Sequence, residues 1–170
     1  MTNTVFSSTS NFIKVVCGGN EIRSVITNIL NSKTIPNRIR IISYSLENVK
    51  ISDGLKLEDL LSKLAMRGAT ISIVIGQMPA KKVKRVLVNL NKMGINVYYN
   101  RRAHAKIILV EGIENYAIIM TANVTHGGLY YNYEAGILMR LSEDIHRKIR
   151  DYTNNIIGSE ETEDMVNMYE

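Results

Sequence analysis

The chain is poor in cysteine, proline and tryptophan: its 170 residues include 1 Cys, 2 Pro and no Trp. Cys17 has no second cysteine to pair with, which argues against a disulfide-stabilised exported scaffold. There is no run of about 18 apolar residues, so no membrane-spanning helix is expected. Residues 1–10 have neither a positive start nor an apolar run, which argues against a secretory signal. We therefore expect a cytoplasmic protein with a flexible N-terminus over residues 1–10 and no stable membrane association.

The formal net charge is +5, but it is unevenly distributed. Residues 159–170 contain five acidic residues and no basic one, so the rest of the chain is more basic than the total suggests. A basic body favours an anionic partner such as nucleic acid or anionic lipid, although solubility explains it equally well. The acidic segment 159–170 is expected to be a solvated C-terminal tail. The alternative is that it folds back over a basic groove as a mimic of phosphate.

The length and the 45% hydrophobic content predict a single compact domain, which we place at residues 11–158. Short β-rich runs alternate with segments of helical period, a pattern typical of an α/β fold. The expected helices cover 21–30, 55–66, the segment from Pro79 to Gly94, and 143–157. The expected strands cover 12–16, 38–46, 69–75, 95–99, 104–111, 116–121 and 134–141.

Histidine points to the first candidate site, because its charge changes near neutral pH. His104 and Lys106 begin a predicted strand, where side chains two residues apart share a face, so an imidazole and an ammonium group project side by side. Such a pair is suited to handling phosphate. A second H-x-K triplet, 146–148, falls in a helical pattern, where residues two apart diverge, and we interpret it as surface charge. His126 is expected in an exposed loop, with lining of a site as the alternative.

A resemblance emerges from the residues that follow this pair. Glu111 comes four apolar residues after Lys106, and a later strand ends in 121–123, Thr-Ala-Asn. This order resembles the phospholipase D superfamily pattern H-x-K-x4-D followed by G-S-x-N. The segment 132–134, Asn-Tyr-Glu, resembles the N-x-E element of its nuclease-like members. The resemblance implies a phospholipase D-like α/β domain, with a mixed, mostly parallel sheet flanked by helices on both faces.

Three positions depart from the family pattern. Glu111 stands in place of Asp and Thr121 in place of Ser, changes that keep the carboxylate and the hydroxyl. Met120 stands in place of Gly, which is expected to add bulk close to the phosphate. Glu111 lies an odd number of residues from His104 and Lys106, so it faces the other side of an ideal strand. We therefore expect Glu111 to be structural, either bonding neighbouring backbone or pairing with a basic residue.

The family uses two H-x-K motifs, one histidine attacking phosphorus and the other protonating the leaving oxygen. This chain has one usable copy, so the resemblance implies a homodimer with the active site on its two-fold axis. It further implies a nuclease that works through a phosphohistidine without metal or other cofactor. Asn132 and Glu134 would orient His104 or a lysine that binds the substrate. The residues expected to be catalytic are His104, Lys106, Asn123 and Glu134, and those expected to bind substrate are Arg101, Arg102, Thr121 and Asn132.

Other kinds of site find little support in the sequence. One cysteine and three scattered histidines do not provide the four ligands of a zinc site, and no P-loop or G-x-S-x-G motif is present. Two alternatives to a nuclease remain open. One is a lipid-acting phospholipase or phosphatidyl transferase with the same histidine chemistry, and the other is a non-catalytic nucleic-acid-binding dimer.

Overall fold

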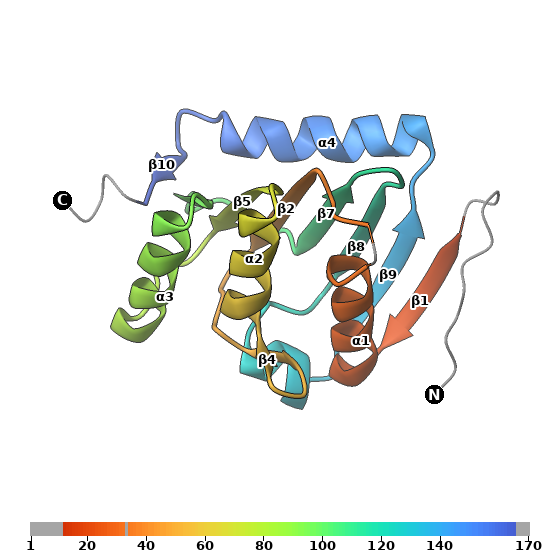
Figure 1. Cartoon of the computed structure of the whole chain (residues 1–170), viewed down its shortest axis with the longest axis horizontal. Helices are drawn as coiled ribbons and strands as arrows, with labels where there is room; N and C mark the ends of the chain where they lie inside the picture. Colours follow the sequence, from red (N-terminus) through yellow and green to blue (C-terminus); the bar gives the residue numbers. More distant parts are fainter. Residues whose placement is uncertain (1–11, 33, 166–170) are drawn as a thin grey trace.

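One large sheet organises the fold (Figure 1). The computed structural model describes residues 12–32 and 34–165. Its eight-stranded sheet has the order β1-β9-β8-β7-β2-β5-β6-β10, and β3 and β4 form a separate hairpin. The strands are β1 (Ile13–Cys17), β2 (Arg38–Ser43), β3 (Lys50–Ser52), β4 (Leu55–Lys56), β5 (Thr70–Ile75), β6 (Asn96–Tyr99), β7 (Ile107–Glu111), β8 (Tyr116–Met120), β9 (Ala135–Arg140) and β10 (Glu163–Asp164).

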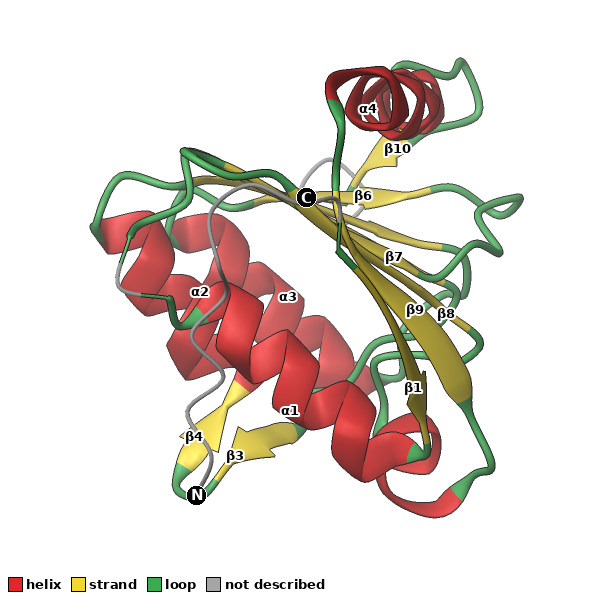
Figure 2. Ribbon diagram, turned by 90° about the vertical axis from the view of Figure 1, so that its right-hand side faces the viewer, coloured by secondary structure: helices red, strands yellow, loops and turns green. Residues whose placement is uncertain are grey.

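Helices cover both faces of this sheet (Figure 2). Three of them, α1 (Gly19–Leu30), α2 (Leu57–Met66) and α3 (Lys81–Lys92), lie on one face, and α4 (Glu143–Ile157) lies on the other. A short π-helical segment, η1 (Gly127–Tyr131), follows β8. The single α/β domain with a mixed sheet between helices is therefore confirmed. None of the helices in the described part of the chain is long and apolar enough to cross a bilayer.

The helices form because their apolar side chains recur at helical spacing. The buried residues of α1 and α2 are Ile22, Val25, Ile26, Ile29 and Leu30, and Leu57, Leu60, Leu61 and Leu64. They pack on the apolar residues that β2, β5 and β7 direct to that face, and together these form the main core. A smaller cluster on the opposite face joins Ile42, Val74 and Ala103 to Ile156 and Ile157 at the end of α4.

The strand directions correct one sequence-based prediction. Only β2–β5 and β5–β6 are parallel pairs in the described sheet, and its other neighbours are antiparallel. The sheet is mixed as predicted, but the expectation that it is mostly parallel is wrong. The consecutive strands β7, β8 and β9 are direct neighbours in the sheet, and such connections make them antiparallel.

Two short elements were not predicted. The helix expected over 55–66 begins at Leu57, because residues 50–56 form the β3–β4 hairpin. The acidic end contributes β10, which pairs with β6, and Met165 beyond it is buried in the main core. Residues 159–165 are therefore part of the folded domain, and the expectation of a solvated tail is wrong for them. The expected flexible N-terminus, residues 1–10, and residues 166–170 lie outside the described residues.

Tyr116, the first residue of β8, is expected to make the stability of the fold depend on pH. Burial and the carboxylate of Glu114, which accepts a hydrogen bond from the Tyr116 hydroxyl, raise the pKa of Tyr116 to about 12. The folded protein thus holds this proton more tightly than the unfolded chain, whose tyrosine pKa is about 10. The resulting stabilisation is complete below pH 10 and is lost as the pH rises through 12. Urea unfolding between pH 9 and pH 12 should show a steeper loss of stability for the wild type than for Tyr116→Phe.

Candidate active site

The predicted site residues extend from one end of four neighbouring strands, β9, β8, β7 and β2. These neighbours are antiparallel, so β2 and β8 end where β7 and β9 begin. Ile107, the first residue of β7, pairs with both Ile42 and Ile119, and Met120 pairs with Gly136. The segments just beyond these pairs are 43–45, 104–106, 121–123 and 132–134. The topology therefore brings four separate parts of the sequence to the same end of the sheet.

His104 and Lys106 meet there as a pair. The Nζ atom of Lys106 lies 3.3 Å from His104 Nδ1 and donates to the His104 carbonyl oxygen at 2.9 Å. Both residues precede β7, which begins at Ile107, so the strand expected to start at His104 is shorter than predicted. The neighbouring ladder still holds the segment, because the Met120 amide donates to the Lys106 carbonyl at 3.1 Å. The side-by-side arrangement of imidazole and ammonium is present, with His104 exposed.

Close packing fixes the backbone that leads into His104. A Cβ atom added to Gly76, directly after β5, would lie 2.0 Å from the Ala103 carbonyl oxygen, so only glycine fits. The Tyr44 ring lies 5.0 Å from the His104 ring, centroid to centroid, at 55°. Tyr44 was not predicted as a site residue. Its sequence signal is the polar segment Ser-Tyr-Ser at 43–45, which directly follows an apolar strand that ends at the site.

Asn123 is positioned by the end of β2. Its Oδ1 atom accepts from the Ser45 amide at 3.4 Å and lies 3.4 Å from the Ser43 Oγ atom, whose hydrogen is donated to the Ser45 carbonyl oxygen at 2.6 Å. Ser43 is fully buried, and its Oγ also accepts from the Val124 amide at 3.1 Å. Gly128 of η1 packs so tightly that an added Cβ would lie 2.3 Å from the Asn123 carbonyl oxygen. With its oxygen held in this way, the Asn123 amide nitrogen is the part of the side chain available as a donor to substrate.

Glu134 bonds to two predicted neighbours but not to His104. Its carboxylate accepts from the Thr121 hydroxyl and, at 3.3 Å, from Asn132 Nδ2. The Thr121 oxygen in turn accepts from the Ala135 amide at 3.0 Å. The three residues form a polar group beside the ends of β8 and β9. In this structure the Glu134 carboxylate orients Thr121 and Asn132, whereas the sequence suggested that it orients His104 or a lysine.

Met120 does not obstruct the site. The sequence analysis placed its side chain close to the phosphate, but it is buried in the main core at 6% exposure. Its partner across the ladder is Gly136, where an added Cβ would lie 2.9 Å from the Met120 Cβ. A glycine on β9 thus provides the space that the methionine on β8 requires. The expectation of bulk near the phosphate is wrong.

A family model described as "Cardiolipin synthase, PLD-like domain" matches residues 25–157, well over half of the chain. The chain belongs to the phospholipase D superfamily. The match includes His104, Lys106, Asn123 and Glu134, whose geometry is described above. Among curated proteins, no significant match is found.

Solved structures share the phospholipase D fold at low sequence identity. Nuc from Salmonella typhimurium, described as a phospholipase D family member, matches with a TM-score of 0.76 and 16% identity over 91% of this chain and 98% of Nuc. NucT from Helicobacter pylori matches with a TM-score of 0.70 and 15% identity over 88% of this chain and 98% of NucT. Phosphatidylserine synthase from Haemophilus influenzae matches with a TM-score of 0.69 and 14% identity over 100% of this chain and 44% of the synthase.

Glu111 of this phospholipase D-like domain pairs with a basic residue, one of the two arrangements that the sequence suggested. It is buried beneath α4, where its carboxylate binds the Arg40 guanidinium and lies 2.7 Å from His146 Nε2. Arg40 also donates to Asn154 Oδ1 at 2.9 Å. Burial lowers the pKa of Arg40 below its usual value, while the Glu111 charge opposes that shift. His146 was interpreted as surface charge, and that interpretation is wrong: its side chain is 14% exposed and joins α4 to the sheet.

Arg101 and Arg102 precede the His-Lys pair of the domain. Their side chains are 77% and 76% exposed. Arg102 donates to Glu161 Oε1 at 2.9 Å, and Arg101 Nε lies 4.0 Å from Glu161 Oε2. The Arg102 amide donates to Asn100 Oδ1 at 2.9 Å, which holds the loop in a turn. The acidic segment therefore folds back over these arginines, which was the less favoured of the two sequence-based readings.

The third histidine, His126, interacts with groups other than the His-Lys pair. His126 Nδ1 lies 3.5 Å from Glu47 Oε2, and its ring stacks on Tyr130 at 5.5 Å between centroids. Half of its side chain is exposed, in agreement with an exposed loop position. Over residues 12–32 and 34–165, no group of three or more His, Cys, Asp or Glu side chains is placed to hold a metal ion.

Proposed function

We propose that this domain is a phosphodiesterase, specifically a nuclease that hydrolyses nucleic-acid phosphodiester bonds. The observation that carries the proposal is the contact between the His104 imidazole and the Lys106 ammonium group at the exposed end of the sheet. An imidazole is a nucleophile or general acid near neutral pH, and an adjacent ammonium stabilises the charge of phosphate oxygens. The Asn123 amide and the Thr121 hydroxyl extend from the next strand. The fold shared with Nuc and NucT supports the same chemistry.

The reaction requires a second His104, which we propose comes from a second copy of the chain. A two-fold axis brings identical residues of two subunits together. An uncovered apolar face supports self-association: Ile13, Val15, Ile119 and Ile137 are exposed on β1, β8 and β9. Val15 pairs with Ile137, and Ile137 with Ile119, so these side chains form one continuous patch. The patch is next to the site, because Ile119 pairs with Ile107, which follows Lys106 directly.

The mechanism assigns different roles to the two copies of His104. Nε2 of a neutral imidazole attacks phosphorus, and the bond to the leaving oxygen breaks as the second, cationic imidazole gives that oxygen its proton. Water then attacks the phosphohistidine and loses a proton to the second imidazole, which frees the first. Lys106 and Asn123 of both subunits stabilise the non-bridging oxygens. Two facing imidazoles titrate as a coupled pair, so the rate should have a bell-shaped dependence on pH.

Lys106 has to move during this reaction. The Lys106 ammonium group donates to Nδ1 of His104, so Nδ1 carries no hydrogen while this contact lasts. In the neutral imidazole the hydrogen is therefore on Nε2. Attack by Nε2 requires the other tautomer. Transfer of Lys106 from Nδ1 to a phosphate oxygen frees Nδ1 to take the proton. The reactive tautomer of His104 would thus form only after a phosphate has bound.

A lipid substrate is the second candidate function. The matched family model is described as a cardiolipin synthase domain, and phosphatidylserine synthase shares the fold. The same histidine chemistry would transfer a phosphatidyl group. Nucleic acid is favoured here by the exposed arginine pair before His104 and by the basic body of the chain.

The choice of substrate is tested by incubating the purified protein with plasmid DNA, single-stranded DNA, RNA and phosphatidylcholine vesicles, each with EDTA. We expect cleavage of nucleic acid at an undiminished rate with the chelator, because protein cations and donors perform the charge stabilisation. Loss of turnover with EDTA would contradict the metal-independent mechanism. Hydrolysis of vesicles alone would favour the lipid enzyme, and binding of nucleic acid without cleavage would favour the non-catalytic dimer.

A further inference from the structure

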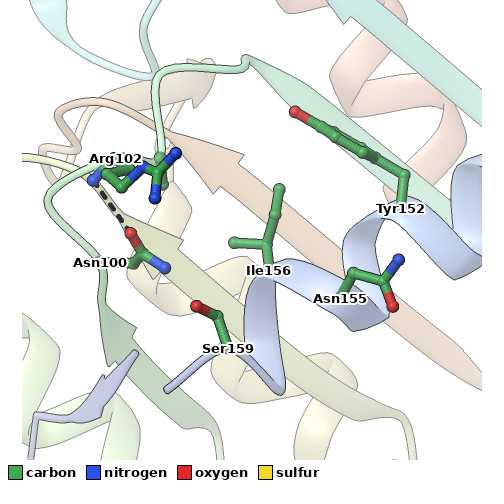
Figure 3. Close-up of a pocket in the computed structure, with 7 residues that line it drawn as sticks. Asn100, Arg102, Tyr152, Asn155, Ile156 and Ser159 are labelled. Carbon is green, nitrogen blue, oxygen red and sulfur yellow. Dashed lines mark hydrogen bonds between the residues drawn. The ribbon is translucent and has the colours of Figure 1, made fainter. Parts of the chain in front are cut away.

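A cavity of about 280 Å³ opens between the loop that leads into His104 and the end of α4 (Figure 3). Asn100, Arg102 and Ala103 line it on the loop side. Tyr152, Asn155, Ile156 and Ser159 line it on the helix side. Its lining thus combines an arginine, amides and hydroxyls with an aromatic ring and an aliphatic side chain. Ala103 directly precedes His104, so the cavity begins one residue from the proposed nucleophile.

At the edge of this cavity, a carboxylate of the chain itself forms ion pairs with two arginines. Glu161 pairs with Arg102 and Arg101, and its Oε2 atom is shielded from solvent without accepting a hydrogen bond. The segment is held by β10, which pairs with β6, and by Asn100 Nδ2, which donates to Thr162 Oγ1 at 2.8 Å. The family match ends at residue 157, before this segment begins. Among protein side chains, a carboxylate most closely resembles two oxygens of a phosphate group.

We propose that this cavity, which Arg102 lines, and the neighbouring Arg101 bind the nucleotide next to the scissile phosphate. The flanking phosphate would take the place of Glu161 on Arg101 and Arg102, and its nucleoside would enter the cavity. The inference rests on the proposed nuclease function and adds a second substrate subsite to it. Glu161 is then an internal competitor, which a strand of nucleic acid displaces when it binds.

The chemistry of the lining suits a nucleoside. Guanidinium groups bind phosphate through paired hydrogen bonds. Tyr152 is half exposed and provides a ring on which a base can stack, and base stacking tolerates any sequence. The Asn155 amide and the Ser159 hydroxyl offer donors and acceptors to the sugar or the base edge. The volume is just below the usual range for small-ligand pockets, about 300–1,000 Å³, which limits the cavity to a single nucleoside.

Glu161→Gln tests the competition, with Glu160→Gln as its matched control. Both variants remove one negative charge from the same segment, but Glu160 is exposed and forms none of the ion pairs of Glu161. In a His104→Ala background that prevents cleavage, fluorescence anisotropy measures the Kd for a short single-stranded oligonucleotide. We expect Glu161→Gln to tighten binding about threefold more than Glu160→Gln at low salt. Equal shifts for the two variants would reduce the effect to net charge and overturn the proposal.

Tyr152→Ala tests the cavity itself. We expect it to weaken oligonucleotide binding by about fivefold or more, the scale of one lost base stack. Tyr152 is half exposed, so the fold should tolerate the change, and the far-ultraviolet circular dichroism spectrum checks this. An unchanged Kd in the folded variant would overturn the assignment of the cavity as a nucleoside site.

A small diester separates this inference from the proposed function. Bis(p-nitrophenyl) phosphate has no flanking phosphate to compete with Glu161, so Glu161→Gln should leave its kcat and KM unchanged, while Glu161→Gln and Tyr152→Ala both alter the KM for DNA. If the wild type hydrolyses neither substrate, the nuclease proposal fails, and the binding measurements still decide the subsite. If both are hydrolysed and neither variant changes the KM for DNA, only the subsite proposal fails.

Discussion

Replacing His104 with alanine is expected to lower kcat/KM for nucleic-acid cleavage by at least about 10²-fold, the scale of a lost general acid or base. In a symmetric dimer the change removes the nucleophile and the acid together. Binding should persist, because Arg101, Arg102 and Lys106 remain and provide the salt-dependent contacts with phosphate. The measurement compares initial rates of oligonucleotide cleavage with Kd values at two salt concentrations.

His126→Ala is the control for this variant. It removes an imidazole that is half exposed and pairs with Glu47, away from the Lys106 contact, so its rate should match the wild type. Subunit mixing tests the shared site directly. If two copies of His104 form one site, a mixed dimer has no complete site, and refolding the wild type with excess His104→Ala protein should inhibit cleavage. Activity in proportion to the wild-type fraction would contradict a shared site.

Replacing Glu111 with glutamine is expected to destabilise the fold by about 3–5 kcal/mol, the cost of leaving one charge of a buried pair uncompensated. Arg40 is 4% exposed, and Glu111 is the carboxylate that binds it beneath α4. Glutamine preserves the size of the side chain, so the loss of charge is isolated from the loss of packing. The His146 contact with this carboxylate is weakened by the same change. Urea unfolding at neutral pH measures the difference.

Asp144→Asn provides the comparison for this buried pair. It removes the ion pair of Asp144 with Arg147 on the exposed side of α4, where both side chains are more than half exposed. Exposed pairs of this kind contribute about 0.2–1 kcal/mol, so the loss of stability should be several times smaller than for Glu111→Gln. Similar small losses for Glu111→Gln and Asp144→Asn would show that the Arg40 charge is not desolvated.

The case of α4 shows what the sequence predicted and what it missed. Its bounds, 143–157, match the prediction, because Ser142 and the acidic residues after it begin a regular helical pattern. Its buried side was not predicted. The apolar residues Ile145 and Tyr152 are 43% and 50% exposed, whereas Thr153 is fully buried and His146 nearly so. Only the end of the helix packs on an apolar cluster, and the rest contacts the buried Arg40–Glu111 pair. Apolar periodicity does not identify a polar contact of this kind.

The contacts of the site residues also divide into those that the sequence predicted and those that it missed. Side chains two apart near the start of a strand were enough to place His104 beside Lys106, since this relation is local. The anchoring of Asn123 by Ser43 joins residues 80 positions apart, and only the strand order brings them together. The pairing of Glu161 with Arg102 likewise depends on β10 returning to the edge of β6. Contacts between distant segments follow from topology, and a single sequence does not specify that order.

The turn that joins β7 to β8 lies at the other end of the sheet from the His-Lys pair. With roughly 3.4 Å per residue, the 5 residues of β7 put about 17 Å between them. Ile113 is 86% exposed at this turn. In a Cys17→Ser background, which removes the exposed thiol beside Ala135, Ile113→Cys could therefore bear a fluorophore or a surface tether without crowding the phosphate. Single molecules attached there would present their reactive end to a DNA strand in solution.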